Sequence, residues 1–283
     1  MCKNSIVRSL SDYVKAIKAI KKDEKEVLFF RGHADQRYLF KPGLYRDVDL
    51  LKKEDVFYHD IMVDYPQEFD RHDHMSNLVK VQHYGGCTRI LDISTNMLSA
   101  LFFAAEEGGT VHGEVMVFSV DRSKVLHHTS DRTLMLACLA PLKYEDKVEI
   151  KKFCESNRGK ITDRAVRGNE AMQHFLHEIR GEFPAFETCI IGEDLLKSYF
   201  VMANRDNARM QSQCGAFVIC GLDEERLNEL GNKADRITID KDSKQEILKE
   251  LELCNITSST VYPDLERRVR YLERRQKLSP QKI

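Results

Sequence analysis

Long apolar runs are absent from the sequence: no segment reaches the roughly 20 apolar residues with which a helix crosses a bilayer. The first 26 residues carry charges throughout and lack the apolar core of a secretory signal. A dominant charge is absent too, because 44 basic and 45 acidic side chains leave a formal net charge of −1. No overall attraction to nucleic acid or to acidic lipid is expected. The sequence therefore predicts a cytoplasmic protein without a membrane partner, disfavours nucleic acid as a partner, and identifies no protein partner.

Paired cysteine motifs are also missing. None of the eight cysteines forms a C-x-x-C pair, which disfavours zinc ribbons and thioredoxin-like redox motifs. In a reducing compartment such cysteines are expected to fill the core. His72, Asp73 and His74, and separately His174 and His177, are suitable ligand types, but neither group has a third partner at a typical metal-site spacing. The sequence predicts no metal site.

The glycine-rich signatures of common nucleotide and hydrolase sites do not occur. The chain contains no P-loop, no G-x-G-x-x-G fingerprint and no G-x-S-x-G elbow. Any phosphate site must therefore be built differently.

The pattern of apolar residues predicts an α+β protein. No repeat, low-complexity tract or linker divides residues 1–283, so a single compact domain is expected. "EVLFFRG", "GEVMVFSV", "GAFVICG" and "RITID" predict strands of a small mixed sheet. Residues 130–183 predict a helical middle segment, and residues 236–283 a strand followed by helices that begin at a capping box of Ser243 and Glu246. Strands and helices do not alternate regularly, which disfavours a doubly wound fold.

Arg31 follows the apolar strand "EVLFF" and precedes Gly32 and His33, and these three are candidate ligand-binding residues. An arginine at the end of a buried strand needs a partner, because an unpaired buried charge is very costly. Its guanidinium suits a phosphate or carboxylate ligand, and Gly32 would let the backbone turn or a ligand approach closely. A structural ion pair with Asp92 is the alternative. Both interpretations stay open.

Residues 81–95, "VQHYGGCTRILDIST", concentrate polar groups directly before a strongly apolar helix, "NMLSALFFAA". His83 titrates near neutral pH, and Asp92 lies where a helix N-terminus favours negative charge, so these two are the candidate catalytic residues. His83 could equally be a histidine that packs against Tyr84. Ser94, Thr95 or Asn96 is expected to cap the helix. The candidate ligand-binding residues of this stretch are Tyr84, Thr88, Arg89, Ser94 and Thr95.

A third polar cluster, "NARMQSQCGAF", leads into a late strand. Arg209, Gln211 and Gln213 would share one strand face. Arg209 and Gln213 complete the candidate ligand-binding set. The alternative is a solvated strand end.

In this order, these clusters resemble the FRG domain family, which takes its name from the Phe-Arg-Gly found here at residues 30–32. The resemblance implies an FRG core at residues 23–221 and a site near its motifs, but no reaction, because the family is largely uncharacterised. Its members occur in bacteria and phages, which implies by analogy a role in phage defence. The resemblance rests on six blocks: "FFRGH", "KPGLYR", "QHYGGCTRILDISTNMLSALFFA", "SDRTLML", "RMQSQCGAF" and "NITSSTVYPDLE".

A second, weaker similarity is to ADP-ribosyltransferases of the Arg-Ser-Glu type. Their order of motifs is matched by Arg31, then Ser94-Thr95, then Gln211 to Gln213, with Gln213 standing where those enzymes have a glutamate. This similarity implies that Arg31 holds a phosphate of NAD. The residues themselves identify no cofactor.

Three hypotheses follow. The first is an enzyme acting on a nucleotide or another phosphate-bearing ligand, with the candidate residues around one cleft. The second is a non-catalytic ligand-sensing or interaction module, in which Arg31, Arg89 and Asp92 form a buried ion network. The third, ranked last, is a nuclease-like or RNA-associated protein that uses the basic helix expected at residues 263–278.

Overall fold

The computed structural model describes residues 6–20, 23–106, 110–203 and 215–262. Two predicted features lie outside these ranges: the polar cluster of Arg209, Gln211 and Gln213, and the basic helix expected at 263–278.

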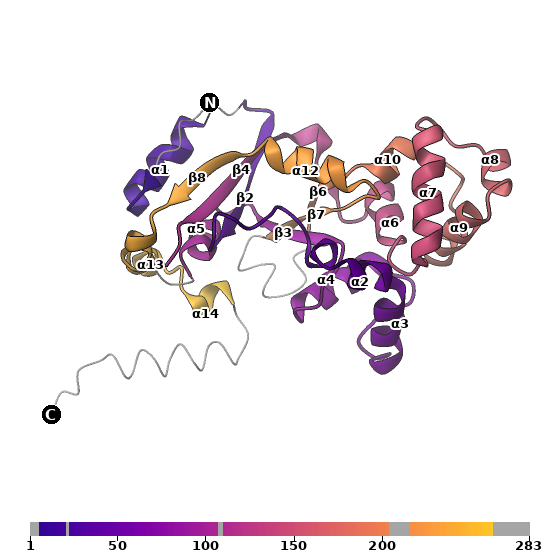
Figure 1. Cartoon of the computed structure of the whole chain (residues 1–283), viewed down its shortest axis with the longest axis horizontal. Coiled ribbons are helices and arrows are strands. Elements are labelled where there is room, and N and C mark those ends of the chain that lie inside the picture. Colours follow the sequence, from indigo (N-terminus) through magenta and orange to yellow (C-terminus); the bar gives the residue numbers. More distant parts are fainter. Residues whose placement is uncertain (1–5, 21–22, 107–109, 204–214, 263–283) are drawn as a thin grey trace.

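The described residues form one mixed sheet of eight strands, which confirms the α+β fold (Figure 1). The strand order is β1-β8-β4-β2-β3-β7-β6-β5, and the pairs β1/β8 and β5/β6 are parallel while the other neighbours are antiparallel. The four strands read from the sequence are β2, β4, β7 and β8. The strands are β1 (Ile6–Val7), β2 (Glu26–His33), β3 (Ile90–Ser94), β4 (Gly113–Asp121), β5 (Leu126–His127), β6 (Tyr199–Met202), β7 (Gly215–Ile219) and β8 (Asp235–Ile239).

The helices cover the sheet and extend beyond one end of it (Figure 1). The expected helical middle segment is confirmed as α6 to α9. The helices are α1 (Leu10–Ala19), α2 (Val48–Lys52), α3 (Glu54–Asp64), α4 (His74–His83), α5 (Met97–Ala105), α6 (Asp131–Ala137), α7 (Tyr144–Ser156), α8 (Asp163–Arg167), α9 (Glu170–Glu182), α10 (Gly192–Leu196), α12 (Glu224–Asn232), α13 (Lys244–Leu253) and α14 (Ser258–Val261), with short 3-10 turns η1 (Gly43–Arg46), η2 (Arg122–Lys124) and η3 (Lys241–Ser243).

One capping prediction is wrong. Ser243 does precede α13, but its side chain caps no backbone amide and instead donates to Asp240 Oδ2 at 3.1 Å. The pattern Ser-x-x-Glu marks a capping box only when the serine adopts extended backbone, and Ser243 is helical because the turn η3 runs directly into α13. A capping box does form at α14, between Thr257 and Thr260.

Successive side chains of β2 point to opposite faces of the sheet, as in any strand. Phe29 stacks on Phe200 with ring centroids 5.1 Å apart on one face. Phe30 packs on the other face, beneath α1, α5 and α13. Further along that same face, Ile90 and Phe217 pack against α4, α6 and α9. One sheet face therefore carries two helical groups, and the boundary between them follows the junction of β2 and β3.

Candidate functional site

A pocket of about 190 Å³ lies at this junction of β2 and β3. The ladder between the two strands consists of the pair Phe30 and Ser94. The pocket combines one arginine, one carboxylate and one hydroxyl with an apolar wall that includes Phe103 of α5. Its lining residues are Phe30, Arg31, Gly32, Asp92, Ile93, Ser94, Ala100 and Phe103.

Arg31 is held in place by two hydrogen bonds of its guanidinium group. Its Nε donates to His33 Nε2 at 3.0 Å, and its Nη1 donates to the Asp92 carbonyl oxygen at 2.5 Å. Within the described part of the chain, its Nη2 amino group has no acceptor. Burial lowers the pKa of Arg31 to about 10, with Asp92 acting in the opposite direction. Arg31 therefore remains cationic at neutral pH and keeps unused donors beside the pocket.

His33 supports Arg31 from behind. It is buried, and burial, together with the charges of Arg31, Arg46 and Arg236, lowers its pKa to about 3. The ring is therefore neutral, and because Nε2 accepts a hydrogen bond, the proton must reside on Nδ1. Among the described residues, Nδ1 has no partner. Sequence reasoning placed His33 among the ligand-binding residues, whereas in the structure it positions the arginine and does not line the pocket.

Asp92 is the acidic group of the pocket, and it is oriented from α4. Gln82 Nε2 donates to Asp92 Oδ2 at 3.4 Å, and Thr88 Oγ1 donates to Gln82 Oε1 at 2.8 Å. Thr88 is buried and thus reaches the site through Gln82. The sequence motif contained Gln82, but its role as the link between Thr88 and Asp92 was missed.

Ser94 ends strand β3 and does not cap α5. The cap is Asn96, whose side chain accepts from the Leu98 amide at 2.9 Å. The Ser94 hydroxyl accepts from the Asn96 amide at 2.8 Å, so it fixes the turn between strand and helix. Thr95 lies in that turn, between the strand and the cap. Of the two hydroxyls, only Ser94 is among the residues that line the pocket.

Gly32 serves the packing of helix α5 against β2. A Cβ atom at this position would clash with the Ala100 carbonyl oxygen and would lie 2.8 Å from Phe103 Cβ. The close approach expected at Gly32 is therefore made by the helix. This approach brings Phe103 to the pocket wall.

Arg89 is not brought to the pocket. It is buried in an ion group with Glu54 and Lys147: its Nε donates to Glu54 Oε1 at 2.8 Å, its Nη2 donates to Glu54 Oε2, and Lys147 Nζ donates to Glu54 Oε2 at 2.7 Å. Burial alone would raise the pKa of Glu54, but the two cations outweigh it and the pKa is lowered. The same burial lowers the pKa of Lys147. This group connects α3, the residue that precedes β3, and α7.

His83 and Tyr84 end helix α4. Their rings meet edge to face with centroids 5.4 Å apart, as the structural interpretation of His83 expected. Tyr84 is exposed and lines a separate, largely apolar groove beside Tyr65 and Phe69. Neither His83 nor Tyr84 lines the Arg31 pocket.

Arg46 is a functional candidate that the sequence reading did not select. It lies on η1, and its Nη2 donates to the Lys41 carbonyl oxygen at 2.9 Å. Its positive charge lowers the pKa of both Arg31 and His33, so it stands close to the site. The signal was present, since Arg46 ends the "KPGLYR" block. Together with Arg31 it gives this region a positive potential that favours an anion.

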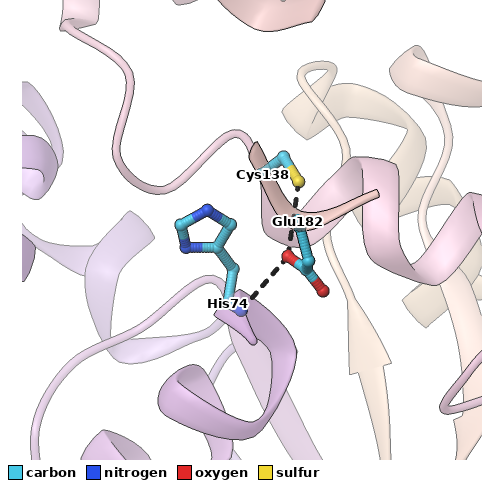
Figure 2. A group of neighbouring side chains, drawn as sticks. All are labelled: His74, Cys138 and Glu182. Atoms are coloured by element: carbon cyan, nitrogen blue, oxygen red, sulfur yellow. Dashed lines mark hydrogen bonds between the residues drawn. The ribbon is translucent and has the colours of Figure 1, made fainter. Parts of the chain in front are cut away.

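One group of potential metal ligands lies away from the pocket. His74, Cys138 and Glu182 each bring a donor atom within 4.8 Å of the others (Figure 2). The pairs His72/His74 and His174/His177, considered from the sequence, contribute only His74 to it.

The FRG domain family model matches residues 26–111 of the chain, which confirms the resemblance over that segment. The match contains β2, β3 and α5, and so every residue that lines the pocket. The wider FRG core expected at 23–221 stays a prediction. No curated protein and no solved structure matches the chain. Within the described ranges, none of the helices has the length and apolar character needed to span a membrane.

Proposed function

We propose that the chain binds a phosphate-bearing ligand, most specifically a nucleotide, in the pocket at the junction of β2 and β3. The observation that carries this proposal is Arg31, a cation fixed by His33 and by the Asp92 carbonyl, with its Nη2 group unused among the described residues. Arginine in such a rigid setting suits phosphate oxygens, because the guanidinium fork is already oriented. The nearby charge of Arg46 adds to the attraction.

The shape of the pocket fits part of a nucleotide. Its volume of about 190 Å³ is below the roughly 300 Å³ at which sites for whole drug-sized ligands begin. It therefore accommodates a phosphate or a single ring, and the remainder of the ligand would extend outside. Phe30 and Phe103 offer apolar contact, while Asp92 offers polar contact for a sugar.

NAD is the specific nucleotide that one further observation favours. Ser94 lies on β3, directly paired with the strand that carries Arg31, as the Arg-Ser-Glu similarity requires, and not in a helix cap. On this proposal Arg31 holds phosphate, and Asp92 stabilises positive charge that develops on the ribose when the bond to nicotinamide breaks. NAD glycohydrolase or ADP-ribosyltransferase chemistry is the resulting catalytic proposal.

Ligand titration with matched variants tests binding. Wild-type protein is titrated calorimetrically with NAD, ATP and GTP, beside Arg31→Met, Arg31→Lys and the exposed control Arg122→Met. Loss of a charge-assisted hydrogen bond costs about 1.5–3 kcal/mol, so Arg31→Met should raise Kd about 10- to 150-fold. Arg31→Lys should recover part of this, since it keeps the charge and loses the fork. Binding that is equally strong in Arg31→Met and Arg122→Met would refute the proposal.

Product analysis separates catalysis from sensing. If NAD is consumed, chromatography detects free nicotinamide, and Asp92→Asn should lower turnover while leaving binding largely intact. If a nucleotide binds and stays unchanged, the non-catalytic sensing module is the better description. Thermal melting of each variant shows whether it remains folded, so a loss of binding can be assigned to the site.

A further inference from the structure

Three side chains with metal-binding atoms converge from three separate helices on the side of the molecule that holds α6 to α9. His74 begins α4, Cys138 follows α6 as its C-terminal cap, and Glu182 ends α9. His74 and Glu182 are 108 positions apart in the sequence, yet the His74 amide donates to Glu182 Oε2 at 3.3 Å. Cys138 Sγ donates to the same oxygen at 3.7 Å (Figure 2). These donors are brought together by the packing of the fold and not by a local sequence motif.

The surroundings of the three donors are acidic. Glu178, one turn before Glu182 on α9, places Oε2 at 3.8 Å from His74 Nε2. Asp73 and Asp70 are the charged groups that act on Glu182, and both add negative charge. Carboxylates gathered beside a buried thiol repel one another, and a bound cation would remove that cost.

The histidine is oriented as metal-bound histidines usually are. The Tyr58 hydroxyl lies 2.8 Å from His74 Nδ1, and Asn77 Nδ2 donates to that hydroxyl at 3.1 Å. Both supporting side chains are buried. Such contacts at one ring nitrogen fix the ring and leave the other, here Nε2, for the metal.

We propose that His74, Cys138 and Glu182 form a binding site for a divalent metal ion of the zinc type. One nitrogen, one sulfur and one oxygen donor suit zinc, whereas magnesium and calcium take oxygen donors. Glu178 or a water molecule completes the tetrahedron. Binding removes the proton of the Cys138 thiol, which passes to solvent.

The required adjustment of the site is small. Tetrahedral zinc with bonds of about 2.0–2.3 Å holds its ligand atoms roughly 3.4–3.8 Å apart. The three donor atoms already lie within 4.8 Å of one another, so side-chain shifts of about 1 Å close the site. The bound ion would fasten α4, α6 and α9 together. Gln82 of α4 donates to Asp92, so the ion would also stabilise the helix that orients the pocket carboxylate.

Cobalt substitution tests the site on the full chain, purified without a metal-binding tag. After dialysis against a chelator, wild-type protein with added Co²⁺ should show a thiolate-to-cobalt charge-transfer absorption and a zinc-dependent rise in Tm. Cys138→Ser should lose the absorption, and Glu182→Gln should bind cobalt more weakly. Cys154→Ser, which alters another buried cysteine on α7, serves as the matched control and should behave as wild type.

Two results would overturn the proposal. One is a wild-type protein that gives no charge-transfer absorption. The other is an absorption that Cys138→Ser and Cys154→Ser retain or lose alike. Should the variants fail to fold, zinc-edge X-ray absorption of the wild type decides alone. A zinc shell with one sulfur and lighter donors supports the site, and a shell without sulfur contradicts it. None of these measurements involves a nucleotide, so the metal site and the proposed function fail independently.

Discussion

Replacing Glu54 by glutamine tests whether the buried ion group that contains Arg89 stabilises the fold. Glu54 is 3% exposed and is the anion shared by Arg89, at 1%, and Lys147, at 6%. Apart from Glu54, the cations contact carbonyl oxygens: Lys147 Nζ donates to Ala140 at 3.3 Å and Arg89 Nη1 to Cys220 at 3.5 Å. The group has two positive charges and one negative charge, so its balance depends entirely on Glu54.

The expected loss is large. Removing one partner of a buried ion pair costs about 3–5 kcal/mol, because a charge is left uncompensated. A typical domain is stable by roughly 5–15 kcal/mol, so Glu54→Gln should remove about a fifth or more of the free energy of unfolding. Lys147→Met removes the second cation and leaves the bidentate pair of Arg89 with Glu54 intact. It should therefore cost clearly less than Glu54→Gln.

Urea unfolding followed by circular dichroism measures these differences, with an unchanged m-value as the sign that the same two states are compared. Glu149→Gln is the matched control, since Glu149 pairs with Lys152 on the exposed side of α7. A surface pair of this kind contributes about 0–1 kcal/mol. If Glu54→Gln loses no more than Glu149→Gln, the ion group does not stabilise the fold, and Arg89 becomes a candidate for another role.

Two further predictions concern residues near the pocket. Gly32→Ala should destabilise the protein by several kcal/mol, because the new Cβ meets the backbone of α5 at Ala100. The control is Gly181→Ala on α9, where a new Cβ meets open space, and it should stabilise the protein by about 0.5–1 kcal/mol. Equal Tm shifts for the two variants would contradict the expected clash at Gly32. For His33, the pKa of about 3 in the folded protein lies below the ordinary histidine pKa of about 6.5. Below pH 6.5 the unfolded chain binds a proton at His33 and the folded protein does not. The free energy of unfolding therefore falls as the pH drops from 6.5 toward 3, by up to about 1.4 kcal/mol per pH unit. His33→Gln should flatten the pH dependence of the unfolding free energy in that window, and an unchanged slope would show that His33 is not held neutral.

The fold was largely readable from the sequence, because its elements are long and strongly patterned. The buried strands at β2 and β4 and the apolar helix α5 were all expected near their observed ends. The two-residue strands β1 and β5 were not, since so short a stretch has no measurable period and forms only because a neighbouring strand is there to pair with.

The cluster of His74, Cys138 and Glu182 could not be predicted for a related reason. Its three donors stand 64 and 44 positions apart along the chain, from 74 to 138 and from 138 to 182. Spacing rules detect ligands that one turn or one helix brings together. These three depend on how α4, α6 and α9 pack, and packing is a property of the whole domain.

Arg31 and Arg89 show why the motif alone did not define the site. Both are arginines of the same resemblance, and both were candidate ligand-binding residues. Arg89 immediately precedes β3 and faces Glu54, so its guanidinium is saturated by a carboxylate of its own chain. Arg31 receives a neutral histidine and a backbone carbonyl instead, and neither of these offsets its charge. Arg31 is half-buried and forms no ion pair with a described carboxylate, although the charge of Asp92 acts on its pKa. A fixed guanidinium without a paired carboxylate is suited to bind an anion, and this is the strongest physical reason to expect an anionic ligand at the pocket.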